Sequence, residues 1–535
     1  MLETEVLIIG SGIAGATAAL QLASNPKRSI VLITREMDPL ESNTRYAQGG
    51  IVSRNSGDDE EALVRDMITA GAGATDPKMA RLLAKEGPPL VDSILVEKAG
   101  VKFDRGEEGE FDWGKEAAHS RRRILHVGDG TGKAIARGLI EALNKCPNVK
   151  IIPNTTAVDL ITVPHHSRDP LATYREMACF GAYAFDQQEK TIHRFVSKAT
   201  VLATGGLGRI YRNTTNPPGS RGDGIAMANR ARVRIVNTEY VQFHPTALAV
   251  PGEERFLVSE AVRGEGGILL TPDGSPFMEK YSPEWKDLAP RHIVARAIHH
   301  EMEANGFSYV LLDIATHMPA EDIRARFPNI YEACIKAGID ITSDPIPVVP
   351  AAHYACGGVL ADEWGRTSIK GLYAVGEVSC TGLHGANRLA STSLLEGLLW
   401  GNRTAEHIDK NLDSGNRPDT PAADSFPRWD ESGLEEDVDP TLIHGDMQTI
   451  QNIMWHYVGL VRSADRLSRA IRELRHLWNE IETFYRSTKL SDGLIGLRNA
   501  VEVALIVARA ASHNRHSRGC HYRQDSVELE GDRLI

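Results

Sequence analysis

The N-terminal part of the chain alternates short apolar runs with a segment of helical spacing. Residues 6–9 and 30–33 are apolar runs, and the small residues of 12–24 between them have the spacing of a helix. This order predicts a βαβ unit with two parallel strands. Two later apolar runs that end in glycine, at 199–206 and 371–377, predict further buried strands of the same sheet.

The pattern becomes irregular in the middle of the chain, over 240–353. Here we expect a helix near 289–305, a strand near 309–312 and a proline-rich return at 345–350. These elements interrupt the parallel sheet between its strands at 199–206 and 371–377. The pattern therefore indicates an inserted domain.

A second change follows the last predicted strand. Residues 411–427 have the Pro, Asp, Ser and Gly bias of an exposed linker. Beyond them, apolar residues keep helical spacing from Ile450 to Ile481 and again from Leu494 to Ala511. We expect a separate C-terminal helical domain.

The bulk composition narrows the class of protein. At 535 residues the chain is long enough for about two to four domains. No apolar run approaches the ~20 residues that span a bilayer, and a strand pattern begins within five residues of Met1, where a secretion signal would stand. The six cysteines form no C-x-x-C pair, and the net charge of −11 gives no general attraction for nucleic acids. We therefore expect a cytoplasmic protein without a membrane segment, a metal site or a nucleic-acid partner.

Three glycines at the first turn of the βαβ unit, spaced G-x-G-x-x-G, indicate a nucleotide site. Such a turn lets backbone N–H groups and the N-terminus of the following helix approach a pyrophosphate. Glycines also close ordinary turns, but the strand, helix and second strand around this motif favour a dinucleotide. The acid that usually binds the ribose is imperfect here, because Thr34 ends the second strand and Arg35 and Glu36 follow it.

Other polar segments favour a flavin over a nicotinamide cofactor. The loop at 42–50 is polar, ends in two glycines and is too elaborate for a plain crossover. Glu377 would face the ribityl hydroxyls, and a helix that begins near 391–395 would direct its positive end toward the flavin ring. Taken singly, Glu377 and Ser393 are better explained as a helix-edge carboxylate and an N-cap serine.

Several separated motifs together resemble the superfamily of succinate dehydrogenase and fumarate reductase flavoprotein subunits. They are NTRYAQGG (43–50), QFHPT (242–246), EAVRGEG (260–266), PR (290–291), PAAHY (350–354) and GLHGANRLAS (382–391). Within that superfamily the chain resembles the branch that oxidises L-aspartate to iminoaspartate, the first step of NAD biosynthesis through quinolinate. The resemblance covers essentially the whole chain, including its SRG motif at 517–519.

The resemblance implies an α/β fold class with three parts. These are a Rossmann-like FAD-binding domain formed by 1–239 and 354–410, an inserted α+β capping domain at 240–353, and a C-terminal helical domain at 428–535 after the linker. Covalent relatives carry a flavin-linking histidine within the loop where this chain has Asn43. FAD is therefore expected to bind without a covalent bond.

The implied cofactor residues lie in the glycine turn, the 42–50 loop and the later strand ends. They are Gly10, Ser11, Gly12, Ile13, Ala14, Gly15, Arg35, Asn43, Thr44, Arg45, Tyr46, Ala47, Gln48, Gly49, Gly50, Ala203, Thr204, Gly205, Asp223, Glu377, Ser393 and Leu394. The electron acceptor implied is oxygen or fumarate, and the unstable product makes functional coupling to quinolinate synthase plausible.

A dicarboxylate with one ammonium group needs cationic donors at both ends and one acceptor. Arg388 suits one carboxylate, and His353, His244 and Ser259 suit the other. Glu116 matches the family's glutamate that meets the ammonium, although two glycines are common in relatives where this chain has Ala117 and Ala118.

Arg291 matches the family's proton-transfer arginine, so the expected catalytic residues are Arg291, His244 and His353. A guanidinium is a poor base, because it stays protonated in almost any setting. A nearby carboxylate relay, a desolvated site or a purely electrostatic role would each resolve this.

Plainer explanations exist for single residues and for the whole chain. A lone histidine is more often a structural residue than a ligand, and Arg121, Arg122 and Arg123 are best explained as surface charges or local ion pairs. The alternative functions are a soluble fumarate reductase or succinate dehydrogenase flavoprotein, and a flavin-bound assembly module that has lost its chemistry. Glu116 distinguishes aspartate oxidation from the first of these alternatives, because succinate has no ammonium group for this acceptor to bind.

Overall fold

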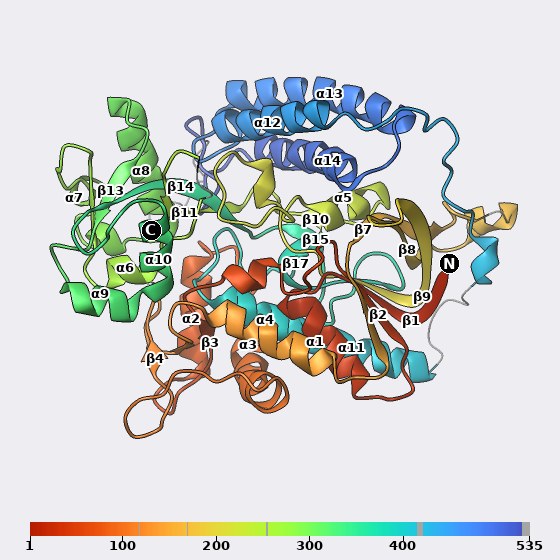
Figure 1. The fold of residues 1–535 in the computed structure, drawn as a ribbon, viewed down its shortest axis with the longest axis horizontal. Coiled ribbons are helices and arrows are strands. Elements are labelled where there is room, and N and C mark those ends of the chain that lie inside the picture. The colour runs from red at the N-terminus through yellow and green to blue at the C-terminus, as the bar shows by residue number, and fades with distance from the viewer. Residues whose placement is uncertain (117, 168, 253–254, 415–420, 527–535) are drawn as a thin grey trace.

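A computed structural model describes residues 1–526 except 117, 168, 253–254 and 415–420. In it, a mostly parallel sheet forms one half of the molecule, a smaller domain lies beside it, and long helices lie above the larger part (Figure 1). This arrangement confirms the predicted α/β class with an inserted domain and a helical C-terminal part.

The parallel part of the sheet is built on β1 (Leu2–Ile9). This strand lies between β2 (Ile30–Ile33) and β9 (Thr191–Leu202) and runs parallel to both. Parallel pairing continues outward from β2 to β6 (Val149–Ile152) and from β9 to β16 (Leu372–Ala374). The four apolar runs predicted as strands therefore belong to one sheet, as expected.

The same sheet continues on one side as an antiparallel extension. Here β9 pairs with β8 (Ala178–Asp186), which pairs with β7 (Thr155–Val163). Because β1, β2, β9 and β16 run in the same direction, their carboxyl ends meet at one edge, where α/β proteins bind ligands.

Helices cover the parallel sheet on the side of α1 (Ile13–Ala23). They are α2 (Glu60–Ala70), α3 (Pro77–Leu90), α4 (Thr131–Leu143) and α11 (Thr392–Ser414). Gly401 of α11 lets this helix approach α1 closely, because a Cβ at Gly401 would lie 2.6 Å from the Ala14 carbonyl oxygen. Trp400, fully buried in the same core, fills the space beside this crossing.

The inserted domain forms around an antiparallel sheet in the order β11, β14, β13, β12. Its strands are β11 (Val241–Leu248), β12 (Ile268–Leu270), β13 (Val310–Asp313) and β14 (Ile346–Ala355), and its helices are α6 (Glu260–Gly264), α7 (Met278–Tyr281), α8 (Arg291–Asn305), α9 (Ala320–Arg326) and α10 (Pro328–Lys336). Two details differ from expectation. The proline-rich return is itself strand β14, with Pro350 at a register irregularity opposite β11, and β14 crosses the expected boundary at 353/354.

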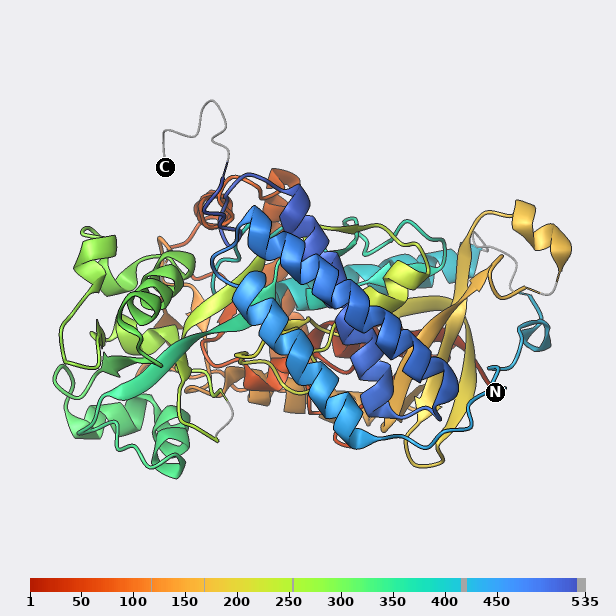
Figure 2. The same ribbon diagram turned by 90° about the horizontal axis from the view of Figure 1, so that it is seen from above.

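The C-terminal part consists of α12 (Pro440–Tyr457), α13 (Ala464–Ser487) and α14 (Asp492–His513), which lie across the molecule in Figure 2. Each helix starts at a capping side chain that accepts a backbone N–H: Asp439, Ser463 and Ser491. The apolar spacing predicted from 450 to 481 is divided between two helices. The first part of the expected linker, 411–414, belongs to α11, and 415–420 lie outside the described residues.

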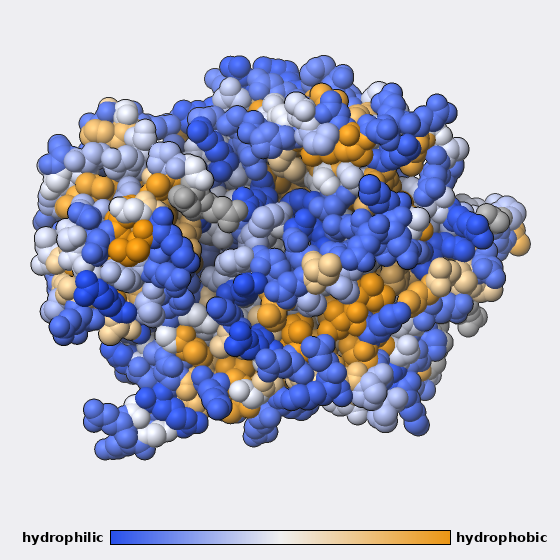
Figure 3. Space-filling model, in the orientation of Figure 1, coloured by the Kyte–Doolittle hydropathy of each residue, from blue (hydrophilic) through white to orange (hydrophobic). Residues whose placement is uncertain are grey.

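Short strands complete the described structure. One small sheet contains β3 (Ile51–Val52), β5 (Ile124–Leu125) and β4 (Trp113–Gly114), and another contains β10 (Ile235–Val236), β15 (Gly358–Leu360) and β17 (Ser379–Cys380); α5 (Asp223–Arg230) packs beside β7. Hydrophilic residues dominate the face drawn in Figure 3, with hydrophobic residues gathered below its centre. Among the described residues, each helix is too short or too polar to cross a bilayer.

Candidate active site

One cavity joins the carboxyl edge of the parallel sheet to the inserted domain. At one end its wall contains the turn after β1 and the residues that follow β2. At the other end it contains side chains from β11, α6, α8 and β14. The cavity thus brings together the predicted nucleotide turn and the predicted substrate residues.

The glycine turn is shaped for close approach of a ligand to the backbone. Gly10 has a φ of +114°, and a Cβ there would lie 2.2 Å from the Ala203 carbonyl oxygen. A Cβ at Gly15 would lie 2.1 Å from the Gly10 carbonyl oxygen, so this glycine lets α1 start directly against the turn. Gly12, the N-cap of α1, supplies no capping side chain, which leaves the positive end of the helix facing the cavity.

Buried polar atoms without partners support a ligand rich in hydrogen-bonding groups. Ser42 Oγ, Gln48 Oε1 and Thr204 Oγ1 have no hydrogen-bond partner among the described residues, and all three residues line the cavity. Since an unpaired buried polar atom costs about 1–3 kcal/mol, these atoms fit a cofactor that bonds to them. The glycine turn and these atoms together fit FAD.

Asn43, the loop residue expected to leave the flavin without a covalent bond, is held by two side chains. Its amide nitrogen donates to Glu377 Oε2 at 2.8 Å, and its amide oxygen accepts from Asn216 Nδ2 at 3.1 Å. Burial raises the pKa of the Glu377 carboxyl to about 7, although hydrogen bonds from the Ala355 N–H and Asn43 partly offset this effect. These side chains hold one another at the cavity wall, and none is a nucleophile toward a flavin.

Most predicted cofactor residues line the cavity. They are Gly10, Ser11, Gly12, Ile13, Ala14, Arg35, Asn43, Thr44, Tyr46, Ala47, Gln48, Gly49, Gly50, Ala203, Thr204, Gly205, Asp223, Glu377, Ser393 and Leu394. Gly15 and Arg45 are not in the wall. Gly15 acts in the turn, and Arg45 is partly exposed and pairs with Glu41 at 3.2 Å and Asp38 at 3.4 Å.

Two arginines meet at the inserted-domain end of the cavity. Arg388 is 6% exposed, donates from Nη1 to Ser393 Oγ at 2.6 Å and lies 4.4 Å from the centre of the Tyr354 ring. Ser393 is therefore a partner of this arginine and does not cap α11. Gln242 Oε1 accepts from Arg388 Nη2 at 3.2 Å and from Arg291 Nη1 at 3.5 Å, so it holds the two cations side by side.

The two predicted substrate histidines lie together, with ring centres 5.3 Å apart. Burial, reinforced by the neighbouring arginines, lowers the pKa of both His244 and His353 well below 6.5, so both rings are neutral at physiological pH. His244 Nδ1 accepts the Thr246 N–H at 3.2 Å, which leaves its Nε2 as the protonated nitrogen. Thr215 Oγ1 lies 2.8 Å from His353 Nδ1 and fixes that ring.

Glu116 reaches the same cavity from the segment before β5. Its Oε2 accepts from Ser391 Oγ at 2.6 Å, and a Cβ on Gly49 would lie 2.0 Å from its Oε1. Burial raises the pKa of this carboxyl, although Arg291 and Ser391 favour the charged form. Ala118 has a φ of +64°, which explains why glycine suits this position; Ala117 lies outside the described residues.

Glu260 is a functional candidate to which the sequence assigned no role. Its Oε2 lies 2.5 Å from Arg291 Nε, and the two side chains are only 3% and 10% exposed, respectively. Burial raises the pKa of Glu260, but Arg291 and Arg263 more than offset this effect and hold it below its usual value. The signal available in the sequence was an acid inside the EAVRGEG motif. Ser259, predicted beside it, lines the cavity and caps α6 through the Ala261 N–H.

The three consecutive arginines divide between the two explanations offered for them: one forms local ion pairs, and two are surface charges. Arg123 is fully buried and donates from Nε to Asp58 Oδ2 at 2.7 Å and from Nη1 to Asp66. Arg121 and Arg122 are exposed. This pairing ties the segment after Glu116 to the start of α2.

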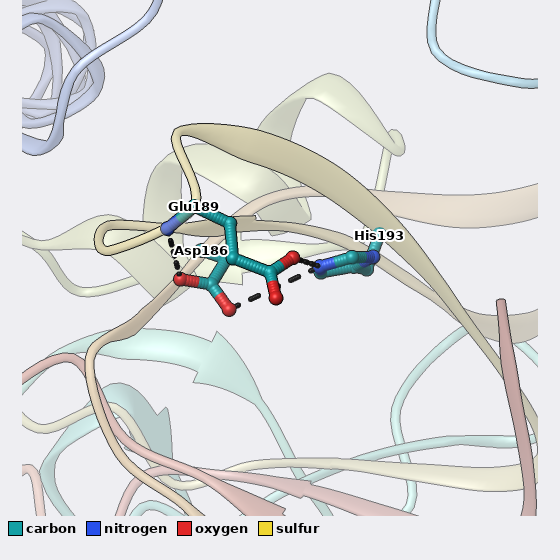
Figure 4. A group of neighbouring side chains, drawn as sticks. All are labelled: Asp186, Glu189 and His193. Carbon is teal, nitrogen blue, oxygen red and sulfur yellow. Dashed lines mark hydrogen bonds and ion pairs between the residues drawn. The ribbon is translucent and has the colours of Figure 1, made fainter.

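A group of Asp186, Glu189 and His193 lies at the turn between β8 and β9 (Figure 4). His193 Nε2 is 3.3 Å from Glu189 and 3.9 Å from Asp186. Asp186 Oδ1 also accepts the Glu189 N–H at 2.9 Å, a hydrogen bond that aspartates commonly form in turns. None of the three residues lines the cavity.

Comparisons with protein families agree with this site. Residues 5–394 match the FAD binding domain family, and residues 447–533 match the fumarate reductase flavoprotein C-terminal family. The fold resembles E. coli quinol fumarate reductase FrdA, with a TM-score of 0.88, 26% identity and coverage of 100% of this chain and 94% of that one. It also resembles Mycobacterium smegmatis Sdh1, with a TM-score of 0.79, 29% identity and coverage of 98% and 90%. The chain is an FAD-binding flavoprotein of the succinate dehydrogenase and fumarate reductase superfamily.

Relatives of known name divide this superfamily further. The L-aspartate oxidase of Pseudomonas aeruginosa is 42% identical over 98% of this chain and 96% of its own length. That of Yersinia pestis is 43% identical over the same shares. Within the superfamily, the chain belongs to the L-aspartate oxidase family.

Proposed function

We propose that this chain oxidises L-aspartate to iminoaspartate with bound FAD, as the first step of NAD biosynthesis through quinolinate. The observation that carries the proposal is the inserted-domain end of a single cavity, beside a dinucleotide turn. It brings together two arginines, two neutral histidines and two carboxylates: Arg291, Arg388, His244, His353, Glu116 and Glu260. L-aspartate has two carboxylates and one ammonium, which this set of groups complements.

The binding roles follow from charge and position. Arg388 suits one carboxylate, and the neutral His244 and His353, together with Ser259, suit the other. Glu116 suits the ammonium, because a nearby cation favours the ionised form that burial disfavours. When bound, FAD supplies a two-electron acceptor for the hydride that leaves C2.

Arg291 and Glu260 suit the proton that leaves C3 while the hydride leaves C2; the enamine formed in this way is a tautomer of iminoaspartate. Arg291 alone would be a poor base, and the pKa of its guanidinium is raised further because Glu260 and Glu116 more than offset burial. Glu260, at 2.5 Å from Arg291 Nε, supplies the carboxylate relay that an arginine needs. Of the three explanations for Arg291 that the sequence left open, we favour the relay.

The finer context of the reaction is also a proposal. We retain oxygen or fumarate as the acceptor, and functional coupling to quinolinate synthase for a product that hydrolyses readily. We retain the cytoplasm as the compartment, since all six cysteines are free thiols. We propose that 240–353 moves as the cap over 1–239 and 354–410, with β14 connecting the two parts.

Anaerobic reduction of the purified yellow protein tests the proposal. L-aspartate should bleach the flavin band, whereas D-aspartate and succinate should not. Bleaching by succinate instead would favour a succinate dehydrogenase or fumarate reductase, and a band that no substrate changes would favour an assembly module. Arg291→Leu should abolish bleaching while FAD stays bound, and a variant that turns over L-aspartate normally would remove Arg291 from the reaction.

A further inference from the structure

The far end of the cavity, opposite the substrate residues, is bordered by the C-terminal helices. Arg35, which follows β2, and Asp223, which begins α5, line the cavity there. Asp492, the first residue of α14, does not line the cavity but bonds to Arg35, which does: Arg35 Nη1 donates to Asp492 Oδ2 at 3.0 Å. The end of β2 is where a Rossmann-like domain receives the adenosine ribose of its cofactor.

Asp492 also holds a second arginine, the buried Arg221, in a forked pair. Arg221 Nη1 donates to Asp492 Oδ2 at 2.9 Å, and Nη2 donates to Asp492 Oδ1 at 3.0 Å. The same Nη2 donates to Asp223 Oδ2 at 2.9 Å. Burial raises the pKa of Asp492, but Arg221 and Arg35 more than offset this effect and lower it to about 2, so the anchor is ionised at every physiological pH.

Further hydrogen bonds tie this anchor to the cavity wall. Thr156 Oγ1 donates to Asp492 Oδ1 at 2.8 Å, and Asn499, one turn or more along α14, donates to Asp223 Oδ1 at 2.9 Å. Arg35, Thr156 and Asp223 all line the cavity. One helix of the C-terminal part therefore fixes three wall residues.

We propose that Asp492 is a positioning residue for the adenosine half of FAD, so that cofactor binding and docking of the C-terminal helices stabilise each other. It acts through Arg35, whose guanidinium forms the wall where the ribose-binding acid of other dinucleotide folds would stand. The inference rests on the proposed FAD role of Arg35 and is independent of which substrate the enzyme oxidises.

The test measures affinity of the FAD-free protein for FAD and for ADP by calorimetry, without substrate. Asp492→Asn should weaken both about tenfold, because the Arg35 side chain loses one of its two carboxylate partners and keeps only the neighbouring Glu36. At saturating FAD, kcat and the KM for L-aspartate should be unchanged. Asp465→Asn is the matched control, since it removes the same charge from the first turn of α13, in the same part of the chain.

Two further measurements separate positioning from simple loss of structure. Arg35→Gln and the double variant Arg35→Gln/Asp492→Asn should have the same FAD affinity. If the double variant instead loses affinity by the product of the two single losses, Asp492 does not act through Arg35. In the unchanged protein, FAD should slow hydrogen exchange of the α14 amides. This measurement does not depend on whether any variant folds. The proposal would be overturned if Asp492→Asn left the affinities for FAD and ADP unchanged. It would also be overturned if the α14 amides exchanged at the same rate with and without FAD.

Discussion

Replacing Glu377 by glutamine should stabilise the FAD-free protein at alkaline pH and not at acidic pH. This carboxyl follows β16 and faces the cavity, where Oε1 accepts the Ala355 N–H at 3.0 Å and Oε2 accepts Asn43 Nδ2 at 2.8 Å. Burial raises its pKa from 4.5 to about 7, since these two donors only partly compensate for lost hydration. Glutamine keeps the shape of the side chain and removes its charge.

The sign follows from which state holds the proton. Below pH 4.5 the carboxyl is protonated in both the folded and the unfolded chain, so the full stability is present. Between 4.5 and about 7 only the unfolded chain releases the proton, so the free energy of unfolding falls as the pH rises. The full difference corresponds to about 3 kcal/mol, an upper limit because water enters the cavity, and the glutamine variant escapes this loss.

Urea unfolding of both FAD-free proteins at about pH 4 and about pH 8 measures the effect. We expect the variant to be more stable by about 1–3 kcal/mol at the higher pH and nearly equal at the lower. Glu41→Gln, at another carboxylate of the cavity wall that pairs with Arg45, serves as the control. A stability difference that is the same at both pH values would refute the titration of Glu377 in this range.

Two predictions concern the reacting end of the cavity. Glu260→Gln should lower kcat at least about 100-fold, the usual contribution of acid–base catalysis, while FAD binding stays unchanged. Stopped-flow flavin reduction measures the rate, and a normal rate would show that Glu260 is not on the proton path. Glu116→Gln should raise the KM for L-aspartate about tenfold or more, because a charge-assisted hydrogen bond contributes about 1.5–3 kcal/mol. Inhibition by succinate, which has no ammonium group, should not weaken in that variant, and an equal loss for both ligands would contradict the assigned contact.

The sequence predicted the parts of the fold that have a strong period. The strands 6–9 and 30–33 and the helix between them could be read directly, because buried parallel strands are continuous apolar runs. Strand β14 was missed because its prolines are typical of a turn, and only the register irregularity opposite β11 makes room for Pro350. The break between α12 and α13 was missed because apolar residues continue on both sides of it.

The predicted site residues were identified by type, but their pairing was not. His244, Arg291, His353 and Arg388 each stand in a motif, so their nature as donors could be inferred from the chain. What decides their chemistry is the partner of each buried charge, and those partners are far away: Glu260 lies 31 positions from Arg291, and Asp492 lies 457 positions from Arg35. An ion pair between distant segments leaves no period in either segment, and its desolvation cost appears only when both are buried together. For this reason the carboxylate beside Arg291 and the helix behind the cofactor wall needed the three-dimensional structure, while the glycine turn did not.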